Sequence, residues 1–377
     1  MQTQNRLLGV DIFRGLAAYG VVLLHSGDSS WGNIDESVLY LRNFFGFPVP
    51  FFLATSFYFM ARTFAKCGWQ NAPHLRILKS KASRLIVPYI VWTIIYSIVR
   101  NIYLVVDNSH AEGQKMLDDT FSVIFFGGAS YHLYFLPLLF TGIVTFVFLN
   151  TWFDWVHINK IIILLIASLI VYEFIDISGN SFELGDNIAF QQLLYPYLEN
   201  TNFSFVWRWI SVELSWSLRC MPYIFFALLM QQAYSKSNKN LKYKLYEKLD
   251  LFIALMLILF VISTFLIKPI WSGTTNNLIV AYSLLIIALL WSKKLSGKLV
   301  EKIASSLGKC SLGIYLIHAM VIPMLKIIIT KVFPGFMAEV SISSVIMLSI
   351  PSFLISWLMV ALLIKHQLVA RYLFAMK

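Results

Sequence analysis

The stretch GVDIFRGLAAYGVVLLHS, residues 9–26, is apolar along almost its whole length and is long enough to cross a membrane as a helix. The rest of the chain has the same character: of its 377 residues, 58% are hydrophobic and only 13% are charged. A soluble chain with so few charged side chains could not cover its surface. The mean hydropathy of +0.72 requires apolar stretches along the whole length rather than in one anchor. The sequence therefore predicts an all-α, polytopic integral membrane protein.

Apolar segments of the length that a membrane helix needs recur along the chain. A helix needs about 20 such residues to cross a hydrocarbon layer of ~30 Å, and we predict about ten spans. Residues 121–126 are too few to cross and are typical of an interfacial or re-entrant segment. The predicted spans are 7–26, 41–61, 85–106, 131–150, 160–176, 210–230, 249–268, 276–292, 308–330 and 341–364.

Lys and Arg are distributed unevenly between the loops that join these spans. The loop between the second and third spans, from Arg62 to Arg84, is basic and contains no acid. The loop after the first span carries Asp28, Asp35 and Glu36 and no base. Because short loops rich in Lys and Arg stay in the cytoplasm, both termini are predicted to be cytoplasmic, in an inner or plasma membrane. The net charge of +11 is then a topology signal, and no nucleic-acid partner is expected.

The sequence lacks the common motifs for bound metals and nucleotides. Its three cysteines form no C-x-x-C pair, and no P-loop, G-x-G-x-x-G or H-E-x-x-H occurs. The longest outer loop, about residues 177–206, is too short for a separate catalytic domain. We therefore expect a single transmembrane domain over residues 1–377, with no separate soluble domain, no metal and no tightly bound cofactor.

The first predicted span contains three residues that are expensive to bury in hydrocarbon, Asp11, Arg14 and His25. Arg14 and His25 are eleven positions apart, so they share one helix face, about 16 Å apart along the axis. Asp11 lies three positions before Arg14, which predicts an ion pair between them. The pattern indicates a polar track through the span, and we predict that its three residues are the catalytic residues. The alternative is a helix-packing seam, with Asp11 and Arg14 as a buried structural pair.

Other titratable residues also fall inside the predicted spans. His132 and His318 are two further intramembrane histidines, and a wet internal cavity would account for several buried imidazoles at once. Glu213 and Arg219 lie on one predicted helix, which favours pairing with other helices or a role in orienting them. Residues near span ends are expected to reach the interface: Arg100, Asp176 and Lys326.

Five ordered segments resemble the membrane-bound acyltransferase 3 family, and together they cover nearly the whole chain. The first holds Arg14 and His25 in the family's R-x10-H arrangement. Lys81 replaces the first Arg of the family's basic R-x-x-R, which ends here at Arg84, and Tyr134 replaces Trp in H-L-W-F-L. The segments are DIFRGLAAYGVVLLH (11–25), VPFFLATSFYF (49–59), KASRLIVPYIVW (81–92), YHLYFLPLLF (131–140) and LGKCSLGIYLIHAMV (307–321).

The resemblance implies an O-acyltransferase. Its donor would be cytoplasmic acyl-CoA, usually acetyl-CoA, and its acceptor a hydroxyl of a surface polysaccharide, a lipid-linked sugar or a related exported glycan. We expect the CoA nucleotide near Lys79, Lys81 and Arg84, with its pantetheine arm running along Arg14 toward His25. His25 would act as general base on the sugar hydroxyl, or accept the acyl group and pass it on, and both routes stay open.

The other candidate residues receive roles from the same resemblance. Arg14 would orient the donor or stabilise developing negative charge. The alternative is a structural role, in which Arg14 holds Asp11 in place. His132, Glu213 and His318 would line a pore or the acceptor side, or hold polar helices together. Many family members carry an attached SGNH-type domain, and none is expected here.

A transporter or flippase is the main alternative, because many spans with buried ionisable residues are also typical of proton-coupled carriers. The sequence has no related halves and no matched pair of interrupted helices, which favours the enzyme. A catalytically lapsed scaffold is a third reading, which Arg14 and His25 at their required spacing make less favoured. The expected partners are acyl-CoA, a sugar acceptor and membrane lipids. The acceptor sugar, the acyl length and the oligomeric state stay open.

Overall fold

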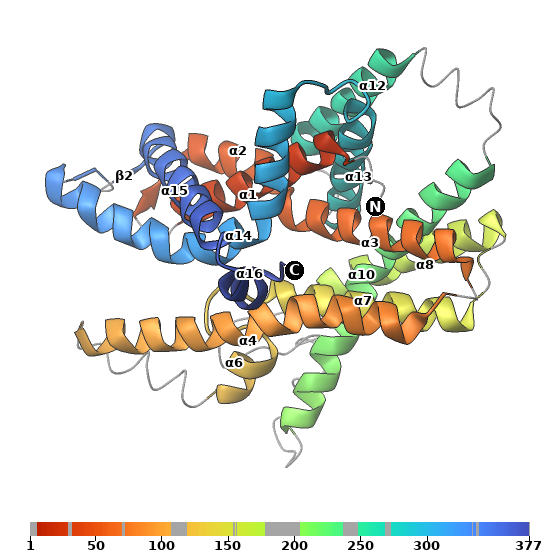
Figure 1. Cartoon of the computed structure of the whole chain (residues 1–377), viewed down its shortest axis with the longest axis horizontal. Helices are drawn as coiled ribbons and strands as arrows, with labels where there is room; N and C mark the ends of the chain where they lie inside the picture. Colours follow the sequence, from red (N-terminus) through yellow and green to blue (C-terminus); the bar gives the residue numbers. More distant parts are fainter. Residues whose placement is uncertain are drawn as a thin grey trace. The chain divides into compact units, whose positions relative to one another are not determined.

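A computed structural model describes most of the chain, and Figure 1 shows its helices. The described residues are 6–28, 32–69, 72–106, 119–153, 155, 157–177, 204–236, 248–267, 273–333, 335–336 and 339–376. Within them almost all regular structure is helical, which confirms the predicted all-α class. The strands are two-residue segments, β1 (Asn33–Ile34) and β2 (Glu339–Val340), which pair in parallel.

The helices follow the predicted spans closely. Among the described residues, 9 helices are long and apolar enough to cross a membrane, and a further apolar helix in α13 is shorter. The chain is therefore a multi-pass membrane protein. The helical elements are α1 (Leu8–Ser26), α2 (Glu36–Phe44), α3 (Pro48–Cys67), α4 (His74–Val106), α6 (Thr120–Phe125), α7 (Phe135–Trp152), α8 (Ile158–Ile177), α10 (Ser204–Lys236), α12 (Leu249–Ile262), η3 (Ser263–Ile267), α13 (Gly273–Trp291), α14 (Lys298–Val332), α15 (Ile342–Leu363) and α16 (Gln367–Phe374).

Several predicted span boundaries differ from the structure, and two of the differences have clear physical reasons. The predicted span 41–61 is divided between α2 and α3, because the chain turns after Phe44 and Pro48 begins a new helix. Proline is well suited to a first helical position, where its missing N–H would have no helical partner. The predicted span 85–106 is part of α4, which begins at His74 because basic residues are good helix formers outside hydrocarbon.

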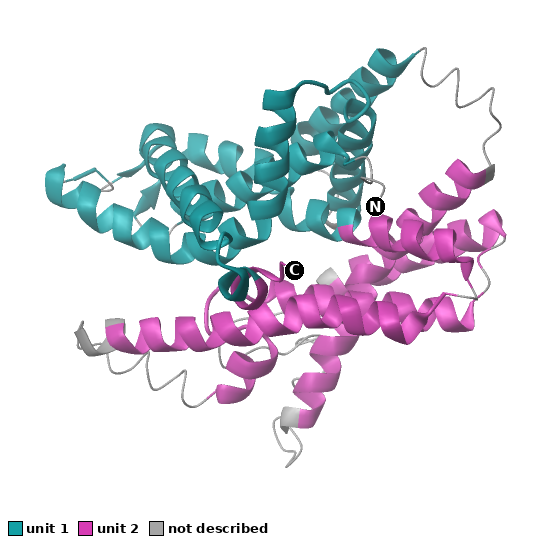
Figure 2. Cartoon of the chain, in the orientation of Figure 1, with its two compact units in different colours: residues 1–55, 238–370 teal, residues 56–237, 371–377 magenta. Residues whose placement is uncertain are grey.

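The chain divides into two compact units, coloured separately in Figure 2. Unit 1 comprises residues 1–55 and 238–370, and unit 2 comprises residues 56–237 and 371–377. The expectation of one transmembrane domain over residues 1–377 stays a prediction.

In unit 1, α1 packs against α13, α14 and α15. Small residues make the close approach possible. A Cβ at Gly9 would strike the carbonyl of Ala288 on α13, and the Gly9 N–H donates to the hydroxyl of Ser292, just after α13, at 2.9 Å. A Cβ at Gly15 would lie 2.9 Å from the Cβ of Leu307 on α14. Such small-residue seams are typical of helix pairs in membranes, where close packing replaces the hydrophobic effect.

In unit 2, α7 packs against α4 and α10, and α10 packs against α8. The short apolar segment predicted at residues 121–126 forms α6, which has only 6 residues. Asp119 caps α6 by accepting from the Ser122 N–H at 3.2 Å. The same carboxylate pairs with the Arg208 guanidinium of α10 through contacts of 2.8 and 2.7 Å. This bidentate pair fixes α6 to the start of α10.

Candidate active site

The polar track of the first span lies on one unbroken helix. α1 runs from Leu8 to Ser26, so it carries Asp11, Arg14 and His25 at the predicted helical spacing. The rise of an α-helix separates Arg14 and His25 by about 16 Å along α1. Both side chains are half-buried, whereas Asp11 is 7% exposed. The predicted placement of these residues on one helix is confirmed.

The predicted ion pair between Asp11 and Arg14 is wrong. The Asp11 carboxylate pairs with Arg6, which precedes α1 and folds back over its first turn. The Arg6 guanidinium also donates to the carbonyl of Ser305 on α14 at 3.0 Å. Gly308 makes room for this arrangement, since a Cβ there would collide with the Asp11 carboxylate. Asp11 is thus linked to α14 through Arg6, and a catalytic role for Asp11 stays a prediction.

This pairing leaves Arg14 with a different status from Asp11. Within the described residues, the Arg14 guanidinium makes no hydrogen bond or ion pair. An arginine inside a membrane span costs several kcal/mol unless it meets water or a partner. The charge of Asp11 still acts on Arg14 without a direct ion pair, and a ligand role for Arg14 stays a prediction.

His25 lies against a second histidine. The ring of His318, on α14, is centred 5.4 Å from the ring of His25, and the two planes are tilted by 31°. His318 is fully buried, and its Nδ1 lies 2.6 Å from the carbonyl oxygen of Tyr315. Since a carbonyl can only accept, Nδ1 carries the proton and a neutral His318 presents Nε2 as an acceptor. The structure thus brings together two histidines that are far apart in the sequence.

Arg42 is a polar neighbour of this pair that sequence reasoning missed. Its guanidinium donates to the carbonyl of Gly27 at 3.0 Å, two positions beyond His25. Arg42 and Asp28 are charged groups that act electrostatically on the His25 ring. Arg42 lies at the edge of the predicted second span, beside the acidic loop after the first span. A lone base beside that acidic loop is the signal that could have identified it.

The structure places the remaining candidates in unit 2. His132 is 1% exposed, lies 3.0 Å from the Ser130 hydroxyl through Nδ1, and meets the edge of the Tyr96 ring. Glu213 on α10 accepts from the Thr141 hydroxyl of α7 at 2.6 Å, so the predicted contact with another helix is confirmed.

Arg219, on the same helix as Glu213, also contacts a neighbouring helix. Its guanidinium lies over the ring of Tyr172 on α8, 5.7 Å from the ring centre. A cation over an aromatic face is stabilised by the electron-rich ring, so Arg219 helps to join α10 and α8.

The proposed donor-binding bases lie on the first turns of α4. Lys79 and Arg84 are exposed, and Lys81 is half-buried. At about 100° per residue, Lys81 and Arg84 lie about 60° apart around the helix, whereas Lys79 is on nearly the opposite side from Lys81. One flat ligand surface therefore includes Lys81 and Arg84 but not Lys79.

Among the described residues, no group of three or more His, Cys, Asp or Glu side chains is arranged to hold a metal ion.

The described helices define the chain as a multi-pass helical membrane protein with an arginine and two adjacent histidines inside its spans. Residues 7–361 match the acyltransferase 3 family, described as an acyltransferase domain. The chain therefore belongs to this family and is a membrane acyltransferase. Searches of curated proteins and of solved structures returned no match.

Proposed function

We propose that the protein is an O-acyltransferase that moves an acyl group, most simply acetyl, from acyl-CoA to a hydroxyl of a surface or exported glycan. The main support for this proposal is the arrangement of polar residues on α1. Arg14 has no partner among the described residues, and on the same helix His25 lies beside the buried His318. The protein would act in an inner or plasma membrane, with both termini in the cytoplasm, where acyl-CoA is made.

The reaction requires a proton acceptor beside the attacking hydroxyl. In the general-base route, the hydroxyl oxygen attacks the thioester carbonyl carbon, its proton passes to His25, and the C–S bond breaks to release CoA. In the covalent route, the His25 imidazole attacks the carbonyl carbon, the C–S bond breaks and the CoA thiolate leaves; the hydroxyl then attacks the acyl-imidazole, its C–N bond breaks, and the hydroxyl proton passes to the thiolate or to water. A neutral imidazole supports either route.

The distance along α1 separates the roles of Arg14 and His25. Because the two residues lie about 16 Å apart along the helix, a group bonded to Arg14 is distant from the carbonyl that reacts at His25. This separation favours contact of Arg14 with the polar body of the donor over contact with the reacting oxygen. Arg14 would then orient acyl-CoA while His25 does the chemistry.

The basic residues at the start of α4 suit the phosphates of CoA by charge. The half-buried Lys81 and the exposed Arg84 share a helix face, so we propose that these two contact a donor phosphate. The opposite position of Lys79 supports a topological role for that residue instead. His132 and Glu213 are proposed to serve the acceptor side, and His318 is proposed to position the His25 ring.

The test uses purified protein in liposomes with radiolabelled acetyl-CoA and a membrane glycan fraction as acceptor. Transfer of label to the glycan is the expected result, whereas a carrier would move its substrate unmodified. His25→Ala is expected to reduce transfer by about 10²- to 10⁴-fold, the usual contribution of a general base. His366→Ala, at an exposed histidine, is the matched control and should keep full activity. Near-normal transfer by a well-folded His25→Ala protein would contradict the assignment.

A further inference from the structure

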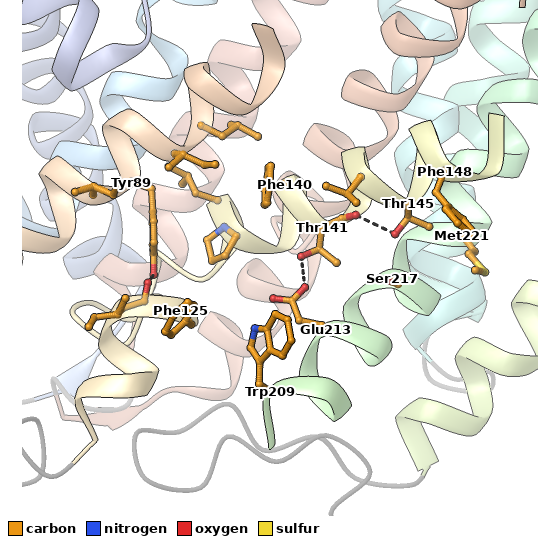
Figure 3. A pocket seen from close by; sticks show the side chains of 17 residues that line it. Tyr89, Phe125, Phe140, Thr141, Thr145, Phe148, Trp209, Glu213, Ser217 and Met221 are labelled. Carbon is orange, nitrogen blue, oxygen red and sulfur yellow. Dashed lines mark hydrogen bonds between the residues drawn. The ribbon is translucent and has the colours of Figure 1, made fainter. Parts of the chain in front are cut away.

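Unit 2 contains a cavity of about 790 Å³ whose lining includes Glu213, the residue proposed above for the acceptor side. It is lined by residues of α4, α6, α7 and α10, and Figure 3 shows their side chains. The volume is within the usual range of small-ligand pockets. Most lining side chains are apolar, and the charged group among them is Glu213, which contacts Thr141.

The cavity is elongated along two helices. On α10 its lining residues recur every four positions, from Trp209 through Glu213 and Ser217 to Met221. This stripe extends about 18 Å along the helix, and the α7 lining from Pro137 to Phe148 extends about 16 Å. Each length is roughly half of the ~30 Å hydrocarbon layer, the depth of one leaflet. The dimensions match one hydrocarbon chain of a lipid.

The lining residues lie mostly on helices of membrane-spanning length. Several of their side chains are exposed at the surface of unit 2. Ile90 on α4 is 51% exposed and Phe148 on α7 is 59% exposed. In a bilayer, apolar side chains exposed on spanning helices face lipid chains rather than water. The cavity is therefore reached laterally from the membrane, and its occupant is itself a membrane component.

The Glu213 carboxylate gives the cavity a specific polar requirement. Thr141 donates to Glu213 Oε2 at 2.6 Å, and the two side chains point toward each other in Figure 3. Within the described residues, Oε1 accepts no hydrogen bond and the carboxylate meets no basic side chain. An ionisable group in a span needs a partner, and a carboxylate oxygen is an acceptor. The ligand must therefore supply a hydrogen-bond donor.

One end of the cavity is held by a fixed contact between α4 and α6. The Tyr89 hydroxyl donates to the carbonyl of Ile124 at 2.8 Å and accepts from the Gly127 N–H at 2.9 Å. Gly127 has a φ of +79°, and a Cβ there would strike the main chain near Tyr134. Ile124 is itself a lining residue. The wall is thus preformed, as ligand sites usually are.

We propose that this cavity binds one hydrocarbon chain of a membrane amphiphile whose hydroxyl group donates a hydrogen bond to Glu213. The apolar walls hold the chain, the lateral opening admits it from the bilayer, and the carboxylate selects the hydroxyl. This binding does not depend on acyl transfer, so it is testable apart from the proposed function.

The experiment uses the full-length protein in lipid nanodiscs and a long-chain alcohol that carries a photoreactive diazirine and an alkyne in its chain. After illumination, the labelled peptides are identified by mass spectrometry. Label is expected on the α7 and α10 peptides that line the cavity. The methyl ether of the same probe lacks the donor and is expected to label about 10-fold less, the usual effect of losing a hydrogen bond to a charged group.

Two substitutions test the site. Ser217→Trp fills the cavity and should reduce labelling at least fivefold, whereas Ser235→Trp, the same change at an exposed position of α10, should leave it unchanged. Glu213→Leu should remove the preference for the alcohol over its ether. Size-exclusion profiles and melting temperatures confirm that each variant is folded. If Ser217→Trp does not fold, Glu213→Leu decides alone.

Two outcomes would overturn the proposal. Equal labelling of exposed α8 peptides and of the cavity peptides would show annular lipid only. Equal labelling by alcohol and ether in the unmodified protein would show that Glu213 selects no donor. Neither result bears on transfer of label from acyl-CoA, so failure here is distinguishable from failure of the proposed function.

Discussion

The seam between α1 and α14 in unit 1 and the cavity between α7 and α10 in unit 2 bury ionisable groups in different ways. At the seam, the Asp11 carboxylate pairs with Arg6, and the missing side chain of Gly308 leaves room for that carboxylate. In the cavity, Glu213 meets only the Thr141 hydroxyl among the described residues. Asp11 therefore has a charged partner, whereas Glu213 has only a neutral one, which is why we propose that a ligand completes the surroundings of Glu213.

The largest expected effect comes from disrupting the contact between α1 and α14 at Gly308. Gly308→Ala puts a Cβ where the Asp11 carboxylate lies, so the helices must separate or the carboxylate must move. Overpacking of this kind should lower the free energy of unfolding by about 3 kcal/mol. Thermal unfolding in detergent measures it, with Gly273→Ala as control because a Cβ there meets only Asn277 at 3.9 Å. Equal melting temperatures of the two variants would refute the role given to Gly308.

A second pair of substitutions separates the two arginines. Arg14→Met removes a cation without a partner among the described residues, so stability should hold or rise while transfer from acyl-CoA falls about 100-fold. Arg6→Met leaves the buried Asp11 carboxylate without its charged partner. The free energy of unfolding should fall by only about 1 kcal/mol, because Arg6 is partly exposed and water already weakens the pair. Melting temperature and initial rate are measured for both. A lower melting temperature for Arg14→Met would show that Arg14 stabilises the helix packing and would contradict its proposed role in donor binding.

The cavity offers a smaller and independent effect. Thr141→Val keeps the shape of the side chain but leaves the Glu213 carboxylate without its donor. The expected cost is about 1 kcal/mol of unfolding free energy. Thr151→Val is the control, since its hydroxyl bonds only to its own helix at Val147, 2.9 Å away. A larger loss for Thr151→Val than for Thr141→Val would deny that the contact between α7 and α10 matters.

The smallest expected effect concerns the donor surface. Lys81→Ala and Arg84→Ala should each raise the KM for acyl-CoA a few-fold, about 1 kcal/mol or less, since exposed charge contacts are weak. Lys79→Ala should not change it, because Lys79 lies on another side of α4. The difference should shrink at high salt, as screening predicts. Kinetics at two ionic strengths measure it, and equal effects for all three residues would favour a diffuse charge role.

The positions of the membrane-spanning segments and the residues that share a helix face could be predicted from the sequence, because both depend on local properties. The spacing of Arg14 and His25 follows from about 3.6 residues per turn, and the unbroken α1 preserves it. The same local reasoning failed for Asp11. Its proximity to Arg14 along the helix suggested a pair, but Arg6 outside the helix competed successfully for the carboxylate.

Contacts between distant segments could not be predicted in the same way. The meeting of His25 with His318 depends on how α1 and α14 pack, which is determined by small residues along both helices. The motif match named both histidines without indicating that their rings would touch. The cavity is harder still to predict, since its walls come from four helices and each supplies an ordinary apolar face.

By itself, the sequence determined that this protein is a multi-pass, all-helical membrane protein and which helix carries Arg14 and His25. Hydrocarbon length and helical periodicity act within one segment, so they can be deduced from a string of residues. Only the tertiary structure decided which buried charges have partners and where the chain leaves a cavity. Those outcomes depend on packing between segments, where each side chain competes for partners that the local sequence does not contain.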